Sequence, residues 1–411
     1  MFLVKRDNFN KTYIIKGLIV ALFFSAFIYL AYFNIEYKIL NTILGLVSLY
    51  LILKINRKTL FTSGFFIGIF WFYWIGNSFE YYGLKEISFL APLGFGIGYA
   101  FLFLLIGIFE FTIYRVFILF ILSFIHPLGF NWFIPELIFI DSYLETSKIS
   151  FALILLALVI FIEMPKKIKL LAFIPLFFTY HNVGEYIDNP SNIKISMPQL
   201  NIAQDQKWIK DNVPTLIEQN LALIDKAIEE KNDLIILPET VFPIVLNNEE
   251  FLLAELIDKS FDINIIAGAL YKEENSYYNA TYHIAKGKVE IAKKVVLVPF
   301  GEEIPFPKFI ADLINNIFYD GAEDYKKADR PTNFVINGTK FRNAICYEAT
   351  SDKIFQNLDD VKYMIAISNN AWFTPSTEPV LQNLLLKYYA KKYDITIFHS
   401  VNGSENNIIR P

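Results

Sequence analysis

One cysteine occurs in the 411 residues of the chain, and its surroundings suit a nucleophile. Cys346 follows an apolar, strand-like run over residues 340–345, and a Thr-Ser-Asp sequence at 350–352 is expected to cap a helix over 353–358. Backbone N–H groups and the positive end of a helix near a thiol favour the thiolate and can bind an oxyanion. A cysteine without such context is more often a buried small hydrophobe, so this interpretation depends on what else the chain carries.

Two carboxylates and a lysine stand at the ends of predicted strands upstream of Cys346. Glu239 ends the buried run Leu-Ile-Ile-Leu-Pro-Glu, and α/β sheets present ligand-facing groups at the carboxyl ends of their strands. In the sequence Lys-Val-Val-Leu-Val-Pro-Phe-Gly-Glu, Lys294 precedes an apolar strand predicted over 295–298, and Glu302 follows a turn. Each stretch alone is an ordinary turn or strand end. Together with Cys-Tyr-Glu at 346–348, in this order, they form a specific pattern.

The second half of the chain alternates strands and helices, as expected for an α/β domain with mixed sheets. The segments predicted as strands are 193–197, 233–237, 263–270, 279–285, 289–293, 295–298, 334–336, 340–345, 363–368 and 395–400. The predicted helices cover 213–231, 249–259 and 379–392.

The first half of the chain is more hydrophobic than the second. The chain is 54% hydrophobic, against about 45–50% in a typical soluble domain, and the excess lies in the first 180 residues. Because a spanning helix needs about 20 mainly apolar residues, we predict about seven spans in a membrane domain over 1–188, followed by a soluble domain over 189–411. The apolar segments are 14–33, 38–53, 60–79, 87–109, 112–127, 150–163 and 169–181.

Charges in the connecting loops give an expected orientation. Lys and Arg are concentrated in the connections that would lie on the same side of the membrane as the N-terminus. These residues are Lys54, Arg57, Lys58, Arg115, Lys166, Lys167 and Lys169. Because cytoplasmic loops carry the excess of Lys and Arg, the N-terminus is expected inside the cytoplasm. An odd number of spans then places residues 185–411 outside it. The net charge of −4 and the absence of a basic stripe with interleaved aromatic residues exclude a nucleic-acid-binding class.

Glu239, Lys294 and Cys346 resemble the Glu-Lys-Cys triad of the nitrilase, or carbon–nitrogen hydrolase, superfamily. With the membrane half in front, the chain looks like a bacterial apolipoprotein N-acyltransferase. The resemblance covers about the whole chain, more loosely in the membrane half, and is carried by 61–82, 207–208 (Lys-Trp), 278–279 (Tyr-Asn), 297–302 (Leu-Val-Pro-Phe-Gly-Glu) and 370–373 (Asn-Ala-Trp-Phe). Members usually continue through further strands to a last spanning helix, whereas this sequence ends at Pro411.

The resemblance implies a multi-span helical membrane domain followed by a nitrilase-like αββα sandwich, in a bacterial inner membrane with the catalytic domain on the periplasmic side. It implies transfer of a fatty acyl chain from a phospholipid, through a thioester on Cys346, to the N-terminal amine of a diacylglyceryl-cysteine lipoprotein. Glu239 would act as general base and Lys294 would stabilise the oxyanion together with a backbone N–H beside Cys346. No metal or cofactor is implied.

The resemblance also implies supporting residues around the triad. Glu302 would hold Lys294 or Glu239 in place. The pocket would be shaped by Tyr347, Glu348 and Asn279, and Trp208 lies on an arm over 201–211 that would contact lipid or close over the substrate.

Two alternatives stay open at this point. One is a membrane-anchored amidase that uses water as acceptor with the same triad. The other is a membrane protein without enzymatic activity, whose soluble half is a binding module.

Overall fold

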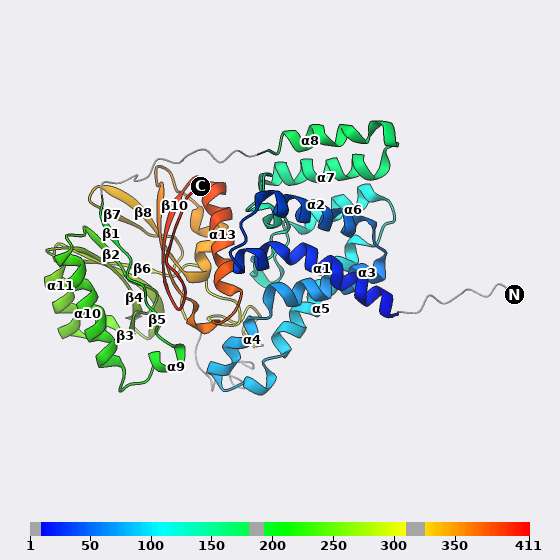
Figure 1. The fold of residues 1–411 in the computed structure, drawn as a ribbon. Helices are drawn as coiled ribbons and strands as arrows, with labels where there is room; N and C mark the ends of the chain where they lie inside the picture. The colour runs from blue at the N-terminus through cyan, green and yellow to red at the C-terminus, as the bar shows by residue number, and fades with distance from the viewer. Residues whose placement is uncertain (1–9, 181–192, 310–324) are drawn as a thin grey trace. The chain divides into compact units, whose positions relative to one another are not determined.

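The computed structural model describes residues 10–180, 193–309 and 325–411 (Figure 1). The described residues divide into two compact units. The first takes in the described parts of Met1–Ile125, Phe133–Gly184 and Ser376–Leu384, and the second those of His126–Trp132, Glu185–Pro375 and Leu385–Pro411. A short stretch between two apolar helices thus belongs to the second unit, which the sequence did not indicate.

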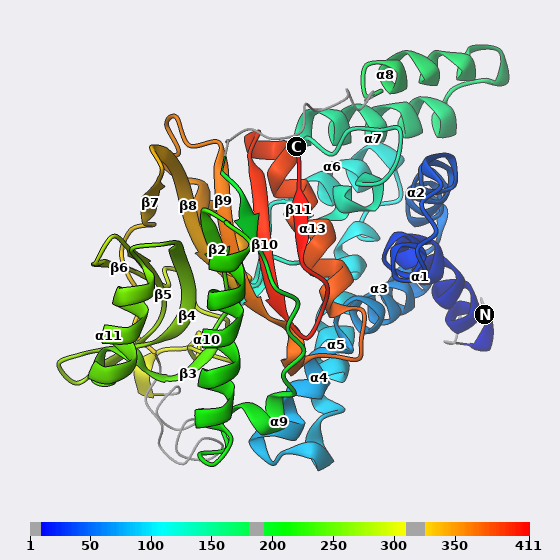
Figure 2. The same cartoon turned by 60° about the vertical axis from the view of Figure 1, so that its left-hand side comes forward.

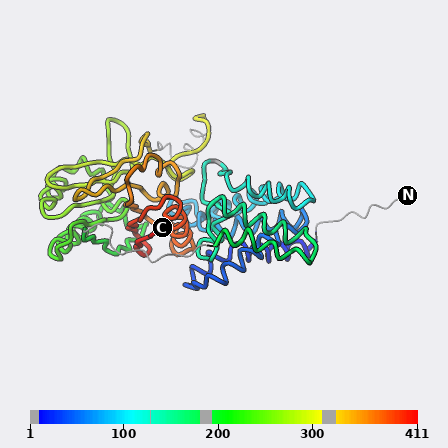
Figure 3. The backbone as a smooth tube through the Cα atoms, turned by 90° about the horizontal axis from the view of Figure 1, so that it is seen from above, coloured from blue at the N-terminus to red at the C-terminus, as the bar shows by residue number. Residues whose placement is uncertain are grey.

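Apolar helices make up the first unit, and each of the seven apolar segments of the sequence contains one. The helices are α1 (Lys11–Tyr32), α2 (Lys38–Lys54), α3 (Arg57–Phe72), α4 (Ile75–Ser78), α5 (Leu90–Ile106), α6 (Thr112–Leu122), α7 (Lys148–Glu163) and α8 (Phe173–Phe177). Figures 1 and 2 show α8 lying beside α7, and Figure 3 shows the backbone of the helices from above.

Only some of these helices are long and apolar enough to cross a membrane by themselves. Lys11–Tyr32 and Lys85–Ile106 meet that test, and Arg57–Phe72 with Ile75–Tyr82 meets it as a pair bent by 49°. Among the described residues, two or three helical segments are therefore long and apolar enough to span a membrane. The number of about seven spans stays a prediction.

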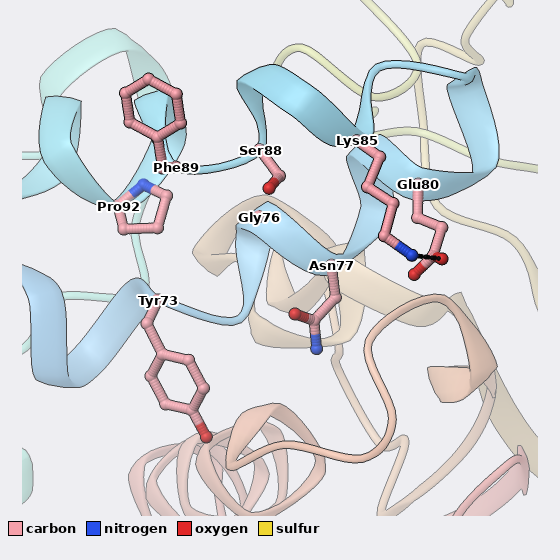
Figure 4. Close-up of a pocket in the computed structure, with 8 residues that line it drawn as sticks. All are labelled: Tyr73, Gly76, Asn77, Glu80, Lys85, Ser88, Phe89 and Pro92. Atoms are coloured by element: carbon pink, nitrogen blue, oxygen red, sulfur yellow. Dashed lines mark hydrogen bonds and ion pairs between the residues drawn. The ribbon is translucent and has the colours of Figure 1, made fainter.

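The first unit contains a cavity of about 190 Å³ beside α4 and the turns that precede α5 (Figure 4). Glu80 and Lys85 form an ion pair of 2.5 Å there, and both side chains are exposed. The lining residues are Tyr73, Gly76, Asn77, Glu80, Lys85, Ser88, Phe89 and Pro92. None of the residues that the sequence predicts for chemistry lines this cavity.

The second unit is built on two sheets. The first sheet has the order β1-β2-β4-β5-β6, with β3 paired to β4, and the second has the order β11-β10-β9-β8-β7. The strands of the first sheet are β1 (Ile195–Ser196), β2 (Leu234–Ile236), β3 (Phe242–Val245), β4 (Asn264–Glu273), β5 (Ser276–Ala285) and β6 (Lys288–Lys293). Those of the second are β7 (Asn333–Ile336), β8 (Thr339–Ile345), β9 (Tyr363–Asn369), β10 (Thr396–Asn402) and β11 (Asn407–Ile409).

The sheets pack face to face between layers of helices. α10 (Val213–Glu229) and α11 (Glu250–Lys259) bury apolar residues against the outer face of the first sheet, and α13 (Glu378–Tyr393) covers the second sheet (Figures 1 and 2). The core between the sheets contains Leu234, Ile236, Ile266, Ala292, Phe334, Ile336, Phe341, Ile345, Ile365, Ile367 and Phe398. The alternation of apolar residues along these strands thus produces the αββα sandwich that the family resemblance implied.

Two predicted elements are wrong, and both flank the candidate site. Residues 295–298 form no strand, because the N–H groups of Val295 and Val296 donate to the carboxylate of Glu348 instead of a neighbouring strand. The α-helix predicted over 353–358 is replaced by one 3₁₀ turn, Asp352–Phe355, which comes after the 3₁₀ turn Cys346–Thr350.

The second error has a specific cause in a buried arginine. The Arg342 guanidinium donates to the carbonyl oxygens of Ile354, Gln356 and Asn357, which a continuing helix would use for its own hydrogen bonds. Asn357 also has a positive φ of 52°, which ends any right-handed turn. Strands β3 and β11 were not predicted, and both are four residues long or shorter.

Candidate active site

Three of the predicted residues lie directly after strands of the sandwich. Glu239 follows β2, Lys294 is the first residue after β6, and Cys346 is the first residue after β8. The Lys294 N–H donates to the carbonyl oxygen of Asn279 at 2.9 Å, which fixes the chain as it leaves the sheet. The two sheets therefore bring to one place three side chains that are far apart in the sequence.

Lys294 is the centre of a buried charge cluster. Its Nζ lies 2.7 Å from Glu302 Oε2 and 3.8 Å from Glu239 Oε1, and the lysine side chain is 1% exposed. Burial alone would lower the pKa of Lys294, but Glu302 and Glu239 outweigh burial and raise the pKa above its ordinary value. The ammonium therefore keeps its charge at neutral pH.

Asn279 orients both carboxylates. Its Nδ2 donates to Glu239 Oε1 at 2.7 Å and to Glu302 Oε1 at 3.1 Å. The second oxygen of Glu302 also accepts the N–H of Val298 at 2.9 Å. Glu302 is thus fully engaged in holding the cluster, whereas Glu239 keeps one carboxylate oxygen outside these bonds.

Cys346 lies on a sharp turn between β8 and a 3₁₀ helix. Its φ is +54°, a conformation that costs a residue with a side chain of order 1–3 kcal/mol and recurs at functional sites. The thiol is neither fully buried nor fully exposed. Cys346 interacts electrostatically with the ammonium groups of Lys294 and Lys207, and both of these interactions favour a thiolate.

Glu348 clamps the backbone on both sides of the cluster. Its Oε1 accepts the N–H of Ile345 at 2.8 Å, and its Oε2 accepts those of Val295 and Val296 at 2.6 and 3.1 Å. Burial raises the pKa of Glu348 to about 7, and Lys294 and these N–H groups limit the rise. One carboxylate thereby ties the residue before Cys346 to the residues after Lys294, so Glu348 braces the backbone of the site.

Tyr347 stacks on aromatic residues from the stretch between α6 and α7. Its ring lies 6.1 Å from those of Phe130 and Trp132, at interplanar angles of 7° and 27°. The hydroxyl donates to Gly129 O at 3.0 Å and accepts the N–H of Asn131 at 3.2 Å. The residue directly after the cysteine is therefore fixed by the stretch His126–Trp132, which belongs to the second unit.

Trp208 is not brought to the charge cluster by any contact among the described residues. It follows the short helix α9 (Gln204–Lys207) and is 42% exposed. The arm that carries it is anchored, because the Asn402 side chain bonds the backbone N–H and C=O of Ile202 at 2.7 and 2.9 Å.

Lys207 is the residue that the sequence analysis missed. It is 1% exposed, and its Nζ donates to the main-chain oxygen of Glu239 at 3.0 Å. The sequence carried a signal, since Lys-Trp at 207–208 belongs to the stretches of family resemblance. Only the structure shows that the lysine, and not the tryptophan, turns towards the candidate site.

A glycine behind Glu239 gives a test of this geometry. A Cβ on Gly268 would lie 2.5 Å from Thr240 N and 2.7 Å from Glu239 Cα, so Gly268→Ala must displace the turn that carries Glu239. A displacement of about 1 Å can cost about 100-fold in rate. We therefore expect Gly268→Ala to slow acylation of Cys346 by a p-nitrophenyl ester, followed as the burst of nitrophenolate, by roughly 10- to 100-fold.

Gly98→Ala is the matched control, because the same methyl group there meets nothing within 4 Å. An unchanged burst in a folded Gly268→Ala protein would mean that the position of Glu239 does not matter for the thiol.

Both halves of the chain match known protein families. Residues 11–182 match the family described as apolipoprotein N-acyltransferase integral membrane domain, and residues 194–396 match the carbon–nitrogen hydrolase family. Among solved structures, XC1258 from Xanthomonas campestris, a CN-hydrolase superfamily protein, aligns with 51% of this chain and 76% of its own, at 15% identity and a TM-score of 0.39.

Whole-protein relatives match along nearly the full length of this chain. An apolipoprotein N-acyltransferase of Wolinella succinogenes is 42% identical over 405 residues, which cover 96% of this chain and 96% of that protein. An apolipoprotein N-acyltransferase of Campylobacter jejuni is 37% identical over 416 residues, covering 100% of this chain and 93% of that protein. The chain therefore belongs to the apolipoprotein N-acyltransferase family.

Proposed function

We propose that this protein moves a fatty acyl chain from a phospholipid to the N-terminal amine of a diacylglyceryl-cysteine on an apolipoprotein, with Glu239, Lys294 and Cys346 as its catalytic residues. The observation that carries the proposal is the buried Lys294 ammonium, which interacts with both the Glu239 carboxylate and the Cys346 thiol in a member of this family. The amidase alternative is not favoured, because the relatives that match the full length are acyltransferases.

In the first half-reaction the thiol is acylated. Glu239 accepts the proton of Cys346, and the thiolate attacks the ester carbonyl carbon of the phospholipid. The negative charge that develops on the carbonyl oxygen is stabilised by the Lys294 ammonium and by a backbone N–H beside Cys346. When the C–O bond breaks, the lysophospholipid oxygen takes the proton from Glu239, and a thioester remains on the enzyme.

In the second half-reaction the thioester is consumed. The free α-amine of the acceptor attacks the thioester carbon, Glu239 accepts the proton that the amine loses, and the Cys346 thiolate leaves. An amide forms, and the proton on Glu239 returns to the thiol. The covalent intermediate lets two lipid substrates use one site in turn, and an apolar helical unit suits substrates whose acyl chains stay in the bilayer.

The first prediction tests the acceptor and the nucleophile together. With a tagged phospholipid and a diacylglyceryl-cysteine peptide, the wild-type protein should transfer the tagged acyl chain to the peptide amine, as measured by mass spectrometry. Cys346→Ala should abolish the transfer, and Glu239→Gln should slow it strongly, because the amide accepts no proton. Release of free fatty acid without peptide acylation would mean that water, and not an amine, is the acceptor, and transfer by Cys346→Ala would exclude Cys346 as nucleophile.

The second prediction compares two neighbouring lysines. Lys294 is buried in the charge cluster, whereas Lys293 points to the other face of the strand, is partly exposed and pairs with Glu273 at 2.7 Å. Loss of one oxyanion donor typically costs about 100- to 1,000-fold in rate, so Lys294→Met should lower single-turnover acylation from phospholipid in micelles by that factor. Lys293→Met should change the rate by less than about threefold, since exposed ion pairs contribute little.

A large defect in Lys293→Met beside a normal Lys294→Met would exchange the roles of the two lysines and refute the proposed triad.

We further propose that the protein lies in the bacterial inner membrane with its catalytic unit on the periplasmic side. The support is the alternation of Lys and Arg between connecting loops, together with the odd number of spans that the sequence predicts. An alkaline phosphatase fused after Asp188 should therefore be active, and a β-galactosidase fused at the same position inactive. The reverse pattern would place the catalytic unit in the cytoplasm.

A further inference from the structure

A second lysine is buried beside the candidate triad. Lys207 ends the helix α9, and its side chain is as buried as that of Lys294. The arm before it is fixed, because the buried Gln204 side chain accepts a hydrogen bond from Asn369 Nδ2 at 2.8 Å. The position of the Lys207 ammonium is therefore set by the fold and not by a flexible surface chain.

Burying an ammonium needs a compensating charge, because desolvation of an isolated cation costs several kcal/mol. The main-chain oxygen of Glu239, 3.0 Å from Nζ, supplies only a dipole. The titratable groups that interact with Lys207 are the carboxylate of Glu239, from the turn after β2, and the thiol of Cys346, from the end of β8. Both stabilise a positive charge on Lys207 only when they themselves are ionised.

We propose that Lys207 is a second buried cation of the active site, which stabilises the Cys346 thiolate together with Lys294 and holds the Glu239 turn through its main-chain oxygen. The inference rests on the proposed function for the role of Cys346 as nucleophile. Lys207 acts through Cys346 and Glu239, so it is a positioning and electrostatic residue and is not assigned a proton transfer.

The two lysines differ in how firmly their charge is held. Lys294 has a carboxylate at 2.7 Å, whereas no carboxylate oxygen of the residues that the structure describes lies within ion-pair distance of Lys207. Burial accordingly lowers the pKa of Lys207 to about 7, against the opposing effects of Glu239 and Cys346. The interaction is mutual, so the charge on Lys207 stabilises the Cys346 thiolate as much as the thiolate stabilises that charge. Removing the charge on Lys207 should therefore make the thiolate harder to form.

Cys346 is the one cysteine of the sequence, so its ionisation can be followed without lipid substrates. The experiment measures the rate of alkylation by iodoacetamide between pH 5 and 10, by intact mass, on the full chain in detergent micelles. Lys207→Gln keeps a donor for the Glu239 oxygen and removes the charge, whereas Lys207→Arg keeps both. A nearby opposite charge shifts an ionisation by about 1–3 pH units, so the midpoint should rise by roughly 1 unit in Lys207→Gln and stay near the wild-type value in Lys207→Arg.

Lys293→Met is the control for loss of a lysine outside the cluster and should leave the midpoint unchanged. A Lys207→Gln protein with the wild-type melting temperature and the wild-type midpoint would overturn the inference. If Lys207→Gln does not fold, Lys207→Arg still tests the inference. A midpoint well below that of the wild type would mean that the arginine adds a charge that Lys207 lacks in the native protein, and this would overturn the inference.

The same profile separates this inference from the proposed function. A wild-type midpoint near that of a free thiol, about 8.5, would show that the lysines do not stabilise the thiolate at rest and would contradict the inference. It would leave the proposed acyl transfer standing, because there Glu239 takes the thiol proton during the reaction. A low wild-type midpoint that does not respond to Lys207→Gln would contradict the role of Lys207 alone.

Discussion

The charge on Lys294 is the constraint on which the rest of the catalytic unit depends. The Lys294 side chain is 1% exposed, so its ammonium has lost nearly all of its hydration, and hydrogen-bonded carboxylates within ion-pair distance offset that loss. Glu302 supplies the close carboxylate, and Asn279 fixes that carboxylate and the one of Glu239 with a single amide group. The sandwich provides the dry interior in which such a cation interacts strongly with charge that develops at a neighbouring atom.

A second constraint is the backbone around the cysteine. The positive φ of Cys346 has to be held by its neighbours, and Glu348 and Tyr347, the two residues that follow, do this in different ways. Glu348 joins the end of β8 to the segment after β6 through backbone N–H groups. Tyr347 is held by aromatic rings and backbone groups of the stretch between α6 and α7. Segments distant in sequence are thus needed to keep one thiol in place.

The sequence was informative wherever a local pattern decides the structure. Alternating apolar residues and the Asn-Gly turn at 337–338 predicted the strands β7 and β8, and apolar residues at helical spacing predicted α10. The strand predicted over 295–298 is wrong for a physical reason. Apolar residues indicate that a segment is buried, but they do not indicate which group accepts the hydrogen bonds of its backbone N–H groups. Glu348, more than 50 positions away, is that acceptor. Lys207 and the stretch His126–Trp132 were missed because their contacts are also with residues far away in the sequence.

The central claim is that the buried cation serves a covalent acyl-enzyme on Cys346. The most direct measurement is peptide mass spectrometry of the protein after incubation with a phospholipid of known acyl chains and no acceptor. The account predicts the mass of one acyl chain on the peptide that contains Cys346, released by neutral hydroxylamine as a thioester is. An acyl group on another residue, or no acyl group on a protein that still acylates an acceptor peptide when one is added, would contradict it.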